Sequence, residues 1–199
     1  MDTGIDYLNT EFQKEDDTTR IISIWDQNIE SDKEVYGIKL GTEYTSEQIN
    51  QAIQLQKSGG DPYSIVPSKD ENGHGTMVAG LVGARGKNKN LRSPAPDGDF
   101  IIVKLREAGP DALAISGVTK PGVLGYMPID IEMAFRYISI ISSNLKRPMV
   151  ILCPFGTNGG YHNGKELISE GLDVIANQAG VVPVVGTGNE GDTDTHTDG

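Results

Sequence analysis

The chain has 199 residues, 37% of them hydrophobic and 23% charged, which is the composition of a globular domain with a sizeable core. No stretch approaches about 18 consecutive apolar residues, so no membrane-spanning helix is expected. The formal net charge of −11 at pH 7 argues against a surface that binds the phosphate backbone of nucleic acid. The single cysteine, Cys153, excludes an internal disulfide and a cluster of metal-bound thiolates.

Both ends of the chain are expected to be cut. The sequence opens on residues 1–4, with no room for a strand before them, and it stops in a polar run after residues 188–191. No signal peptide is recognisable. We therefore expect parts of a larger domain to be missing.

The first half of the chain predicts one strand and two helices. Residues 20–26 are rich in β-branched and aromatic side chains, which favours a strand. Residues 45–48 have the spacing of a capping box, so a helix is expected to begin there and to end near Lys57. Apolar and small residues over 77–82 predict a short, almost wholly buried helix that ends near 83–86.

The second half predicts alternating strands and helices. A loop rich in glycine and proline is expected over 108–125, and the longest helix then begins at Pro128 and extends to about Leu145. A further helix is predicted over 167–176. Continuous apolar runs predict three buried parallel strands, at 99–105, 149–153 and 181–185. This alternation indicates an α/β fold, in which the reactive crevice lies beyond the carboxyl ends of the strands.

The first of three motifs is Asp2-Thr3-Gly4, which is weak alone. It is also the signature of aspartic proteases, where two such aspartates share one proton in an all-β fold. This chain has no second Asp-Thr-Gly or Asp-Ser-Gly and it predicts clear helices, which argues against that class. A turn at Gly4 is the purely structural alternative.

The second motif is the nine-residue string 72–80, centred on His74. Glycines on both sides of His74 leave its imidazole accessible and let the chain turn sharply into a helix. The helix N-terminus disfavours the imidazolium and a nearby carboxylate opposes that effect, so an Asp–His pair there can act as a general base. A capping or buried histidine is the alternative, which the whole string disfavours.

The third motif, 184–191, is a strand end of small residues followed by Asn189. The amide of Asn189 can donate a hydrogen bond to a developing oxyanion, and an Asn–Gly type of turn is the alternative. His162 and His196 are expected to be solvated in polar loops. Calcium could bind the acidic run 192–198, although a solvated loop is preferred there, and no cofactor is predicted.

Together the three motifs resemble the subtilisin-like (subtilase, S8) serine peptidases, whose triad runs Asp, His, Ser along the chain. The resemblance covers nearly all of residues 1–199 and includes the turn at 93–99 and the strand end at 151–156. It implies part of a catalytic domain with an incomplete three-layer αβα fold around a mostly parallel, doubly wound sheet.

Three further segments, 20–27, 44–50 and 155–158, resemble the Csp-type subtilases of clostridia. Those proteins are associated with spore germination. This finer resemblance implies an extracellular or spore-associated location and a protein or peptide substrate. Nucleic acid and a membrane span are not expected.

The resemblance implies a role for each matched residue. Asp2 would orient the base, His74 would act as general base and then general acid, and Asn189 would be the oxyanion donor. The remaining matched residues would bind substrate: a strand edge at Phe155 and Gly156, the carbonyl of Pro154, which stands where the family usually has serine, and the pocket wall at Thr187. Cys153, at the end of an apolar strand, is expected to be a buried, inert thiol.

Two features depart from the family. His74 follows Asp2 by 72 residues, so the segment at about 27–65 is expected to be an insertion. No serine has the Gly-Thr-Ser setting of the nucleophile, since neither Ser93 nor Ser116 matches it. We therefore expect a fragment of a serine endopeptidase that is inactive alone and that either self-associates through its cut faces or is marginally stable. A non-catalytic pseudoprotease that binds or senses a partner is the alternative, and a nucleotide-binding module is disfavoured because no Gly-x-Gly-x-x-Gly follows a strand.

Overall fold

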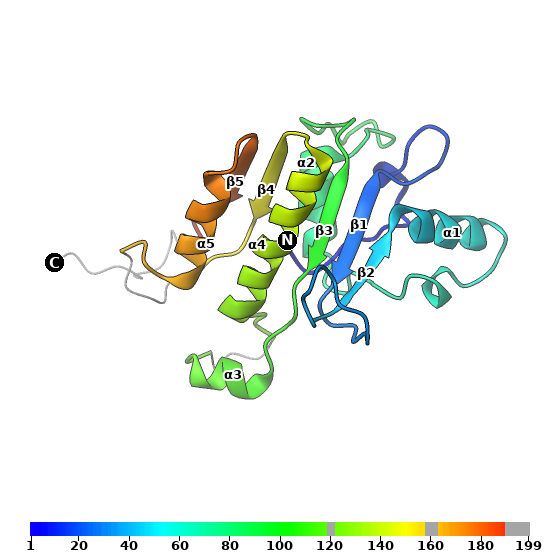
Figure 1. Cartoon of the computed structure of the whole chain (residues 1–199). Helices are drawn as coiled ribbons and strands as arrows, with labels where there is room; N and C mark the ends of the chain where they lie inside the picture. The colour runs from blue at the N-terminus through cyan, green and yellow to red at the C-terminus, as the bar shows by residue number, and fades with distance from the viewer. Residues whose placement is uncertain (119–121, 158–162, 190–199) are drawn as a thin grey trace.

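The structure is a computed structural model that describes residues 1–118, 122–157 and 163–189. The predictions for His162, His196 and the acidic run 192–198 lie outside these residues, as does Asn158. Within the described part, five strands and the helices that flank them form an α/β arrangement, as predicted (Figure 1).

The strands form two sheets. In the first, β1 (Ile21–Asp26) lies between β2 (Thr42–Thr45), which is antiparallel to it, and β3 (Phe100–Lys104), which is parallel. In the second, β4 (Met149–Cys153) and β5 (Val181–Val185) are parallel. The three apolar runs are thus strands, as predicted, but they do not share one hydrogen-bonded sheet, and the short strand β2 was not predicted.

Met1 and Asp2 lie between the two sheets. The amide of Asp2 donates to the carbonyl of Val103 at 3.0 Å, and the amide of Leu105 donates to the carbonyl of Asp2 at 3.0 Å, which makes Asp2 a parallel partner of β3. The amino group of Met1 donates to the carbonyl of Leu152 in β4 at 3.1 Å. This two-residue stub therefore connects the sheets at their carboxyl edge.

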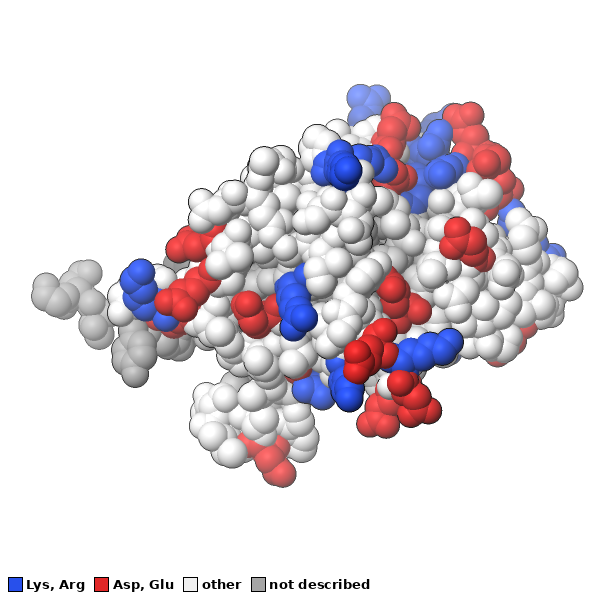
Figure 2. All heavy atoms as spheres, viewed as in Figure 1, with Lys and Arg blue, Asp and Glu red and all other residues white. Residues whose placement is uncertain are grey.

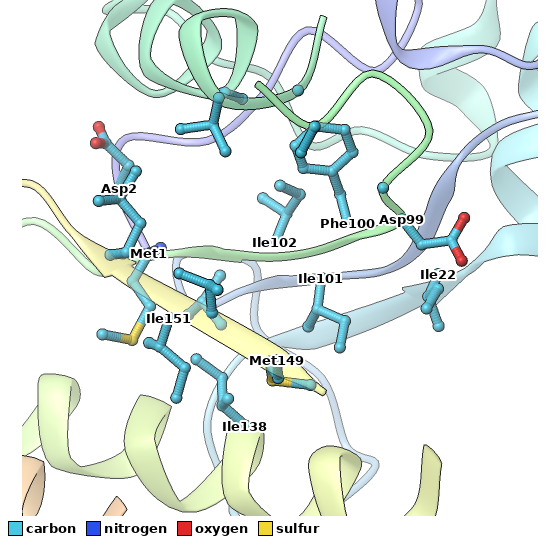
Figure 3. A pocket seen from close by; sticks show the side chains of 18 of the residues that line it. Met1, Asp2, Ile22, Asp99, Phe100, Ile101, Ile102, Ile138, Met149 and Ile151 are labelled. Atoms are coloured by element: carbon cyan, nitrogen blue, oxygen red, sulfur yellow. Dashed lines mark hydrogen bonds between the residues drawn. The ribbon is translucent and has the colours of Figure 1, made fainter. Parts of the chain in front are cut away.

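Away from this stub the space between β3 and β4 is a cavity of about 260 Å³. Figure 3 shows Met1 and Asp2 at one end of the cavity and Asp99 at the other, with Ile101 and Ile151 on its walls. The backbone groups of β3 alternate in direction, as in any parallel ladder, so those of its odd-numbered residues face this cavity and not β1.

Helices cover both faces of the strands (Figure 1). α4 (Pro128–Leu145) packs against α5 (Leu167–Ala176), which also contacts β5. α2 (His74–Gly83) lies on the opposite face from α4, and both line the cavity between β3 and β4. α1 (Ser46–Lys57) packs beside β1 and β2. This is the layered arrangement that the resemblance implied.

The structure also contains short helical segments. Two turns of 3-10 helix are η1 (Thr10–Phe12) and η2 (Pro62–Ser64). α3 (Pro110–Ile115) lies inside the stretch predicted as a loop, so that prediction was wrong there. Pro110 stands in the first helical turn, where its missing N–H costs no helical hydrogen bond.

The caps of the two longest helices explain why their bounds were predictable. The capping box of α1 is present, and the amide of Thr45 donates to Gln48 Oε1 at 2.9 Å. α4 begins at Pro128 and ends before Lys146, which has a left-handed φ of 51°. Both helices have the predicted ends.

Two apolar clusters lie on the two faces of β1. Successive side chains of a strand point to opposite faces, so Ile24 packs with Ile49 and Ile53 of α1, whereas Trp25 packs with Tyr137 of α4. The rings of Trp25 and Tyr137 have centroids 4.7 Å apart, and Trp25 is fully buried. This double packing fixes the first sheet between its helices.

The prediction of an almost wholly buried helix after His74 was wrong. Met77 and Leu81 are 57% and 60% exposed, because the buried positions of α2 are its glycines. The strands predicted as buried are also open in places, with Val150 68% and Val182 55% exposed. Large apolar side chains of α2, β4 and β5 therefore face outward.

Candidate active site

Asp2 and His74 form a direct pair. His74 Nδ1 lies 2.8 Å from Oδ1 and 3.0 Å from Oδ2 of Asp2. The Asp2 side chain is 12% exposed and that of His74 is 43% exposed. Because Nδ1 faces the carboxylate, Nε2 is the nitrogen on the opposite edge of the ring, available to a substrate or nucleophile. The predicted proximity of these two side chains at the carboxyl edge of a parallel strand is confirmed.

Two glycines make this approach possible. Gly73, just before α2, has a φ of +85°, which residues with a side chain rarely adopt. A Cβ added at Gly75 would overlap the carbonyl oxygen of Gly4 and come within 3.1 Å of the Asp2 Cβ. The first turn of α2 therefore rests directly on the loop that follows Asp2.

A carboxylate that sequence reasoning missed lies beside this pair. Asp70 Oδ1 accepts hydrogen bonds from Thr3 Oγ1 at 2.7 Å and from the amide of Gly73 at 2.9 Å. Its Oδ2 accepts from the amide of Thr76 at 2.8 Å and from Thr76 Oγ1 at 2.6 Å. Burial opposes the charged form, but these donors outweigh it and hold the pKa of Asp70 below its usual range. The available signal was an acidic residue just ahead of a helix, where N-terminal capping is common.

The predicted substrate-binding and oxyanion residues lie at the ends of paired strands. Cys153 and Val185 are partners in the β4–β5 ladder, which the amide of Gly186 extends by donating to the Cys153 carbonyl at 3.2 Å. Residues 154–156 and 186–189 therefore leave the same edge of one sheet. Pro154, Phe155 and Gly156 are found in the first segment, and Thr187 and Asn189 are found in the second, where both are exposed. Their roles remain predictions.

Comparison with known proteins identifies the family. The family model described as the subtilase family (Peptidase S8) matches residues 1–198. The chain belongs to this family. It is 30% identical over 130 residues to the major intracellular serine protease of Bacillus subtilis (strain 168), a match that covers 65% of this chain and 33% of that protein.

A solved structure supports the same assignment. The structure of the Clostridium perfringens CspB protease matches 96% of this chain with a TM-score of 0.77 and 29% sequence identity. The match covers 36% of that protease. This subtilase chain thus spans about a third of the length of each relative.

Tyr126 is a second residue that the sequence did not single out. Its ring meets that of Phe155 edge to face, with centroids 6.0 Å apart. Burial, and after it the negative charge of Asp2, raises the pKa of Tyr126 to about 12, so the phenol stays protonated. In this subtilase Tyr126 is therefore a neutral aromatic side chain that packs on Phe155 and lies within electrostatic range of the Asp2 carboxylate. It follows a glycine-rich stretch without periodicity, so no sequence signal indicated it.

Other candidate nucleophiles are occupied or inert. Cys153 is buried, and burial raises the pKa of its thiol to about 11, so its predicted inertness is supported. Ser93 donates its hydroxyl to the Ala84 carbonyl at 2.6 Å, and Ser116 donates to that of Ala112 at 2.9 Å. Among the described residues, no three His, Cys, Asp or Glu side chains are grouped as metal ligands, and no helix is long and apolar enough to cross a membrane.

Proposed function

We propose that this chain is the Asp- and His-bearing part of a serine endopeptidase that cleaves protein or peptide substrates by acyl transfer. The observation that carries the proposal is the contact of His74 Nδ1 with both carboxylate oxygens of Asp2. That contact selects Nε2 as the proton acceptor and stabilises the imidazolium once it forms. The relatives named as proteases support it.

Each matched residue has one task in this mechanism. His74 Nε2 takes the proton of a serine hydroxyl while the serine oxygen bonds to the substrate carbonyl carbon. The Asn189 amide donates to the oxyanion that develops on the carbonyl oxygen. The His74 imidazolium then protonates the leaving amine as the carbon–nitrogen bond breaks, and water releases the acyl group by the same base catalysis. The serine is the part that we propose lies outside these 199 residues.

The substrate would bind along the segments that leave β4 and β5. Phe155 and Gly156 would pair with its backbone, the carbonyl of Pro154 would accept one of its amides, and Thr187 would line the specificity pocket. We propose no nucleic-acid partner, because the net charge is −11 and acidic and basic side chains are interspersed on the face in Figure 2. An extracellular or spore-associated role in germination belongs to this proposal and depends only on the Csp-type motifs.

Labelling with a fluorophosphonate probe tests the proposal. The full-length protein should be labelled at one serine, and His74→Ala should abolish labelling. The 199-residue chain alone should neither be labelled nor hydrolyse casein. Absence of label in the full-length protein would favour the alternative, a subtilase-like binding or sensing module. That alternative stands because these 199 residues contain no Gly-Thr-Ser motif.

A further inference from the structure

The carboxylate of Asp70 connects the loop that carries Asp2 to the helix that carries His74. We propose that Asp70 is a positioning residue that holds the imidazole of His74 at hydrogen-bond distance from the carboxylate of Asp2. Its effect on turnover rests on the proposed function, whereas its effect on the geometry of the pair does not.

The four hydrogen bonds to Asp70 come from two segments that are distant in sequence. Thr3, next to Asp2, donates from one side, and Gly73 and Thr76, which flank His74, donate from the other. Four donors nearly fill the acceptor capacity of a carboxylate. Hydrogen bonds to an ionised acceptor are short and strong, so one rigid group fixes both segments.

The two threonine hydroxyls extend this connection. Thr3 Oγ1 donates to Asp70 and accepts from the amide of Gly75 at 2.9 Å. Thr76 Oγ1 donates to Asp70 and accepts from the amide of Asp6 at 2.8 Å. Each hydroxyl thus spans from one segment to the other, and its orientation depends on Asp70 accepting its proton.

Asp70 is itself held at the carboxyl edge of the first sheet. The preceding carbonyl, that of Lys69, accepts from Lys104 Nζ at 2.7 Å, and the Ser68 hydroxyl donates to Asp26 Oδ2 at 2.7 Å. Asp26 ends β1 and Lys104 ends β3, so residues 68–70 are fixed to the same strand ends as Asp2. A support fixed to rigid strands can hold a pair to the precision that proton transfer needs.

Asparagine at position 70 separates this role from a general effect of charge. An amide has one acceptor oxygen, so its NH2 group would face either the donors Thr3 and Gly73 or the two donors of Thr76. Asp70→Asn should therefore detach one segment while keeping the shape of the side chain. Glu71→Gln is the matched control, because it removes a neighbouring exposed carboxylate.

The readout is the tautomer of His74, measured on the 199-residue chain by ¹⁵N NMR at pH 8, with His74→Gln to assign the signal. The wild type and Glu71→Gln should show the Nδ1–H form with a downfield proton resonance, which Asp2→Asn removes. Asp70→Asn should lose that resonance and give a mixture of tautomers while circular dichroism stays native. A folded Asp70→Asn that retains the wild-type signature would overturn the proposal.

A second pair of variants covers the case in which Asp70→Asn does not fold. Thr3→Val removes the hydroxyl at equal size and should lose the signature, whereas Thr3→Ser should keep it. Equal spectra for the two would count against Asp70 acting through this connection. The NMR result does not depend on activity: loss of the resonance in Asp70→Asn together with an unlabelled full-length protein would support positioning and refute the protease.

Discussion

His74 Nδ1 lies within 3.0 Å of both carboxylate oxygens of Asp2, across 72 residues of sequence. The contact requires the end of β3, beside which Asp2 lies, the first turn of α2 and the loop that follows Asp2 to meet at one point. Perturbing either the carboxylate or the backbone that supports it should therefore have separable effects on catalysis and on stability.

Replacing the Asp2 carboxylate by an amide should nearly abolish catalysis. In the full-length protein, Asp2→Asn should lower kcat/KM on a peptide substrate on the order of 10⁴-fold, because the wrong tautomer is favoured and the imidazolium loses its partner. Steady-state kinetics would measure this. Asp32→Asn, at an exposed position, should leave kcat/KM unchanged; an Asp2→Asn variant with more than a tenth of wild-type activity would contradict the assigned role.

The close approach at Gly75 should make this position intolerant of any side chain. Gly75→Ala should reduce the free energy of unfolding by about 1–3 kcal/mol, since the added methyl group overlaps the Gly4 carbonyl oxygen. Gly109→Ala is the control, because a Cβ there meets nothing within 4 Å. Urea denaturation of both variants would test this. Equal midpoints for Gly75→Ala and the wild type would show that the loop around Gly4 moves to accept the methyl group without loss of stability.

Acid should weaken the fold through Glu11. The carboxylate of Glu11 is buried and accepts the amides of Gly86 at 2.7 Å and Lys87 at 3.1 Å, along with that of Asn88. Burial favours the neutral acid, but these donors outweigh it and lower the pKa of Glu11. A carboxyl with a lowered folded-state pKa stabilises the protein above its unfolded-state pKa, and that contribution is lost as pH falls through the folded-state value.

The free energy of unfolding should therefore fall below about pH 4.5, and Glu11→Gln should flatten that dependence. Urea titrations between about pH 3 and pH 7 would measure both slopes. Glu15→Gln should keep the wild-type slope, because this side chain is 89% exposed. A Glu11→Gln variant as acid-sensitive as the wild type would place the titrating groups elsewhere.

The outward-facing valines should make the chain associate. Val150 and Val182 are 68% and 55% exposed on the adjacent strands β4 and β5. The backbone groups of β3 that face the cavity have Asp2 as their strand partner among the described residues, and the rest of that edge is unpaired there. Exposed apolar side chains and unpaired strand edges favour association. Val182→Lys should lower the average mass in light scattering toward that of a monomer. Ile115→Lys, on α3, should not. A wild-type chain that is monomeric with a sharp, high thermal transition would disprove this expectation.

Local signals predicted most of the fold. The Thr45–Gln48 capping box and the proline at 128 set helix ends by chemistry that acts within four residues, and the Asp2 and His74 motifs predicted a contact across 72 residues. The Asp70 connections were not predictable, because they depend on hydroxyl directions between distant segments. The exposure of Met77 was also missed, since an apolar helix does not itself reveal which face meets the sheet.

The chain has one tryptophan, Trp25, and its burial against Tyr137 has a practical consequence. Its indole Nε1 donates to the Leu40 carbonyl at 2.9 Å, deep in the first sheet and away from β5. Its fluorescence will therefore report most directly on the contact between β1 and α4, within the cluster that also holds Ile151 and Val181 of the second sheet. Circular dichroism reports on both sheets. Unfolding curves that coincide for the two signals would show that both sheets unfold as one cooperative unit, and curves that separate would show that part of the structure unfolds independently of the contact between Trp25 and Tyr137.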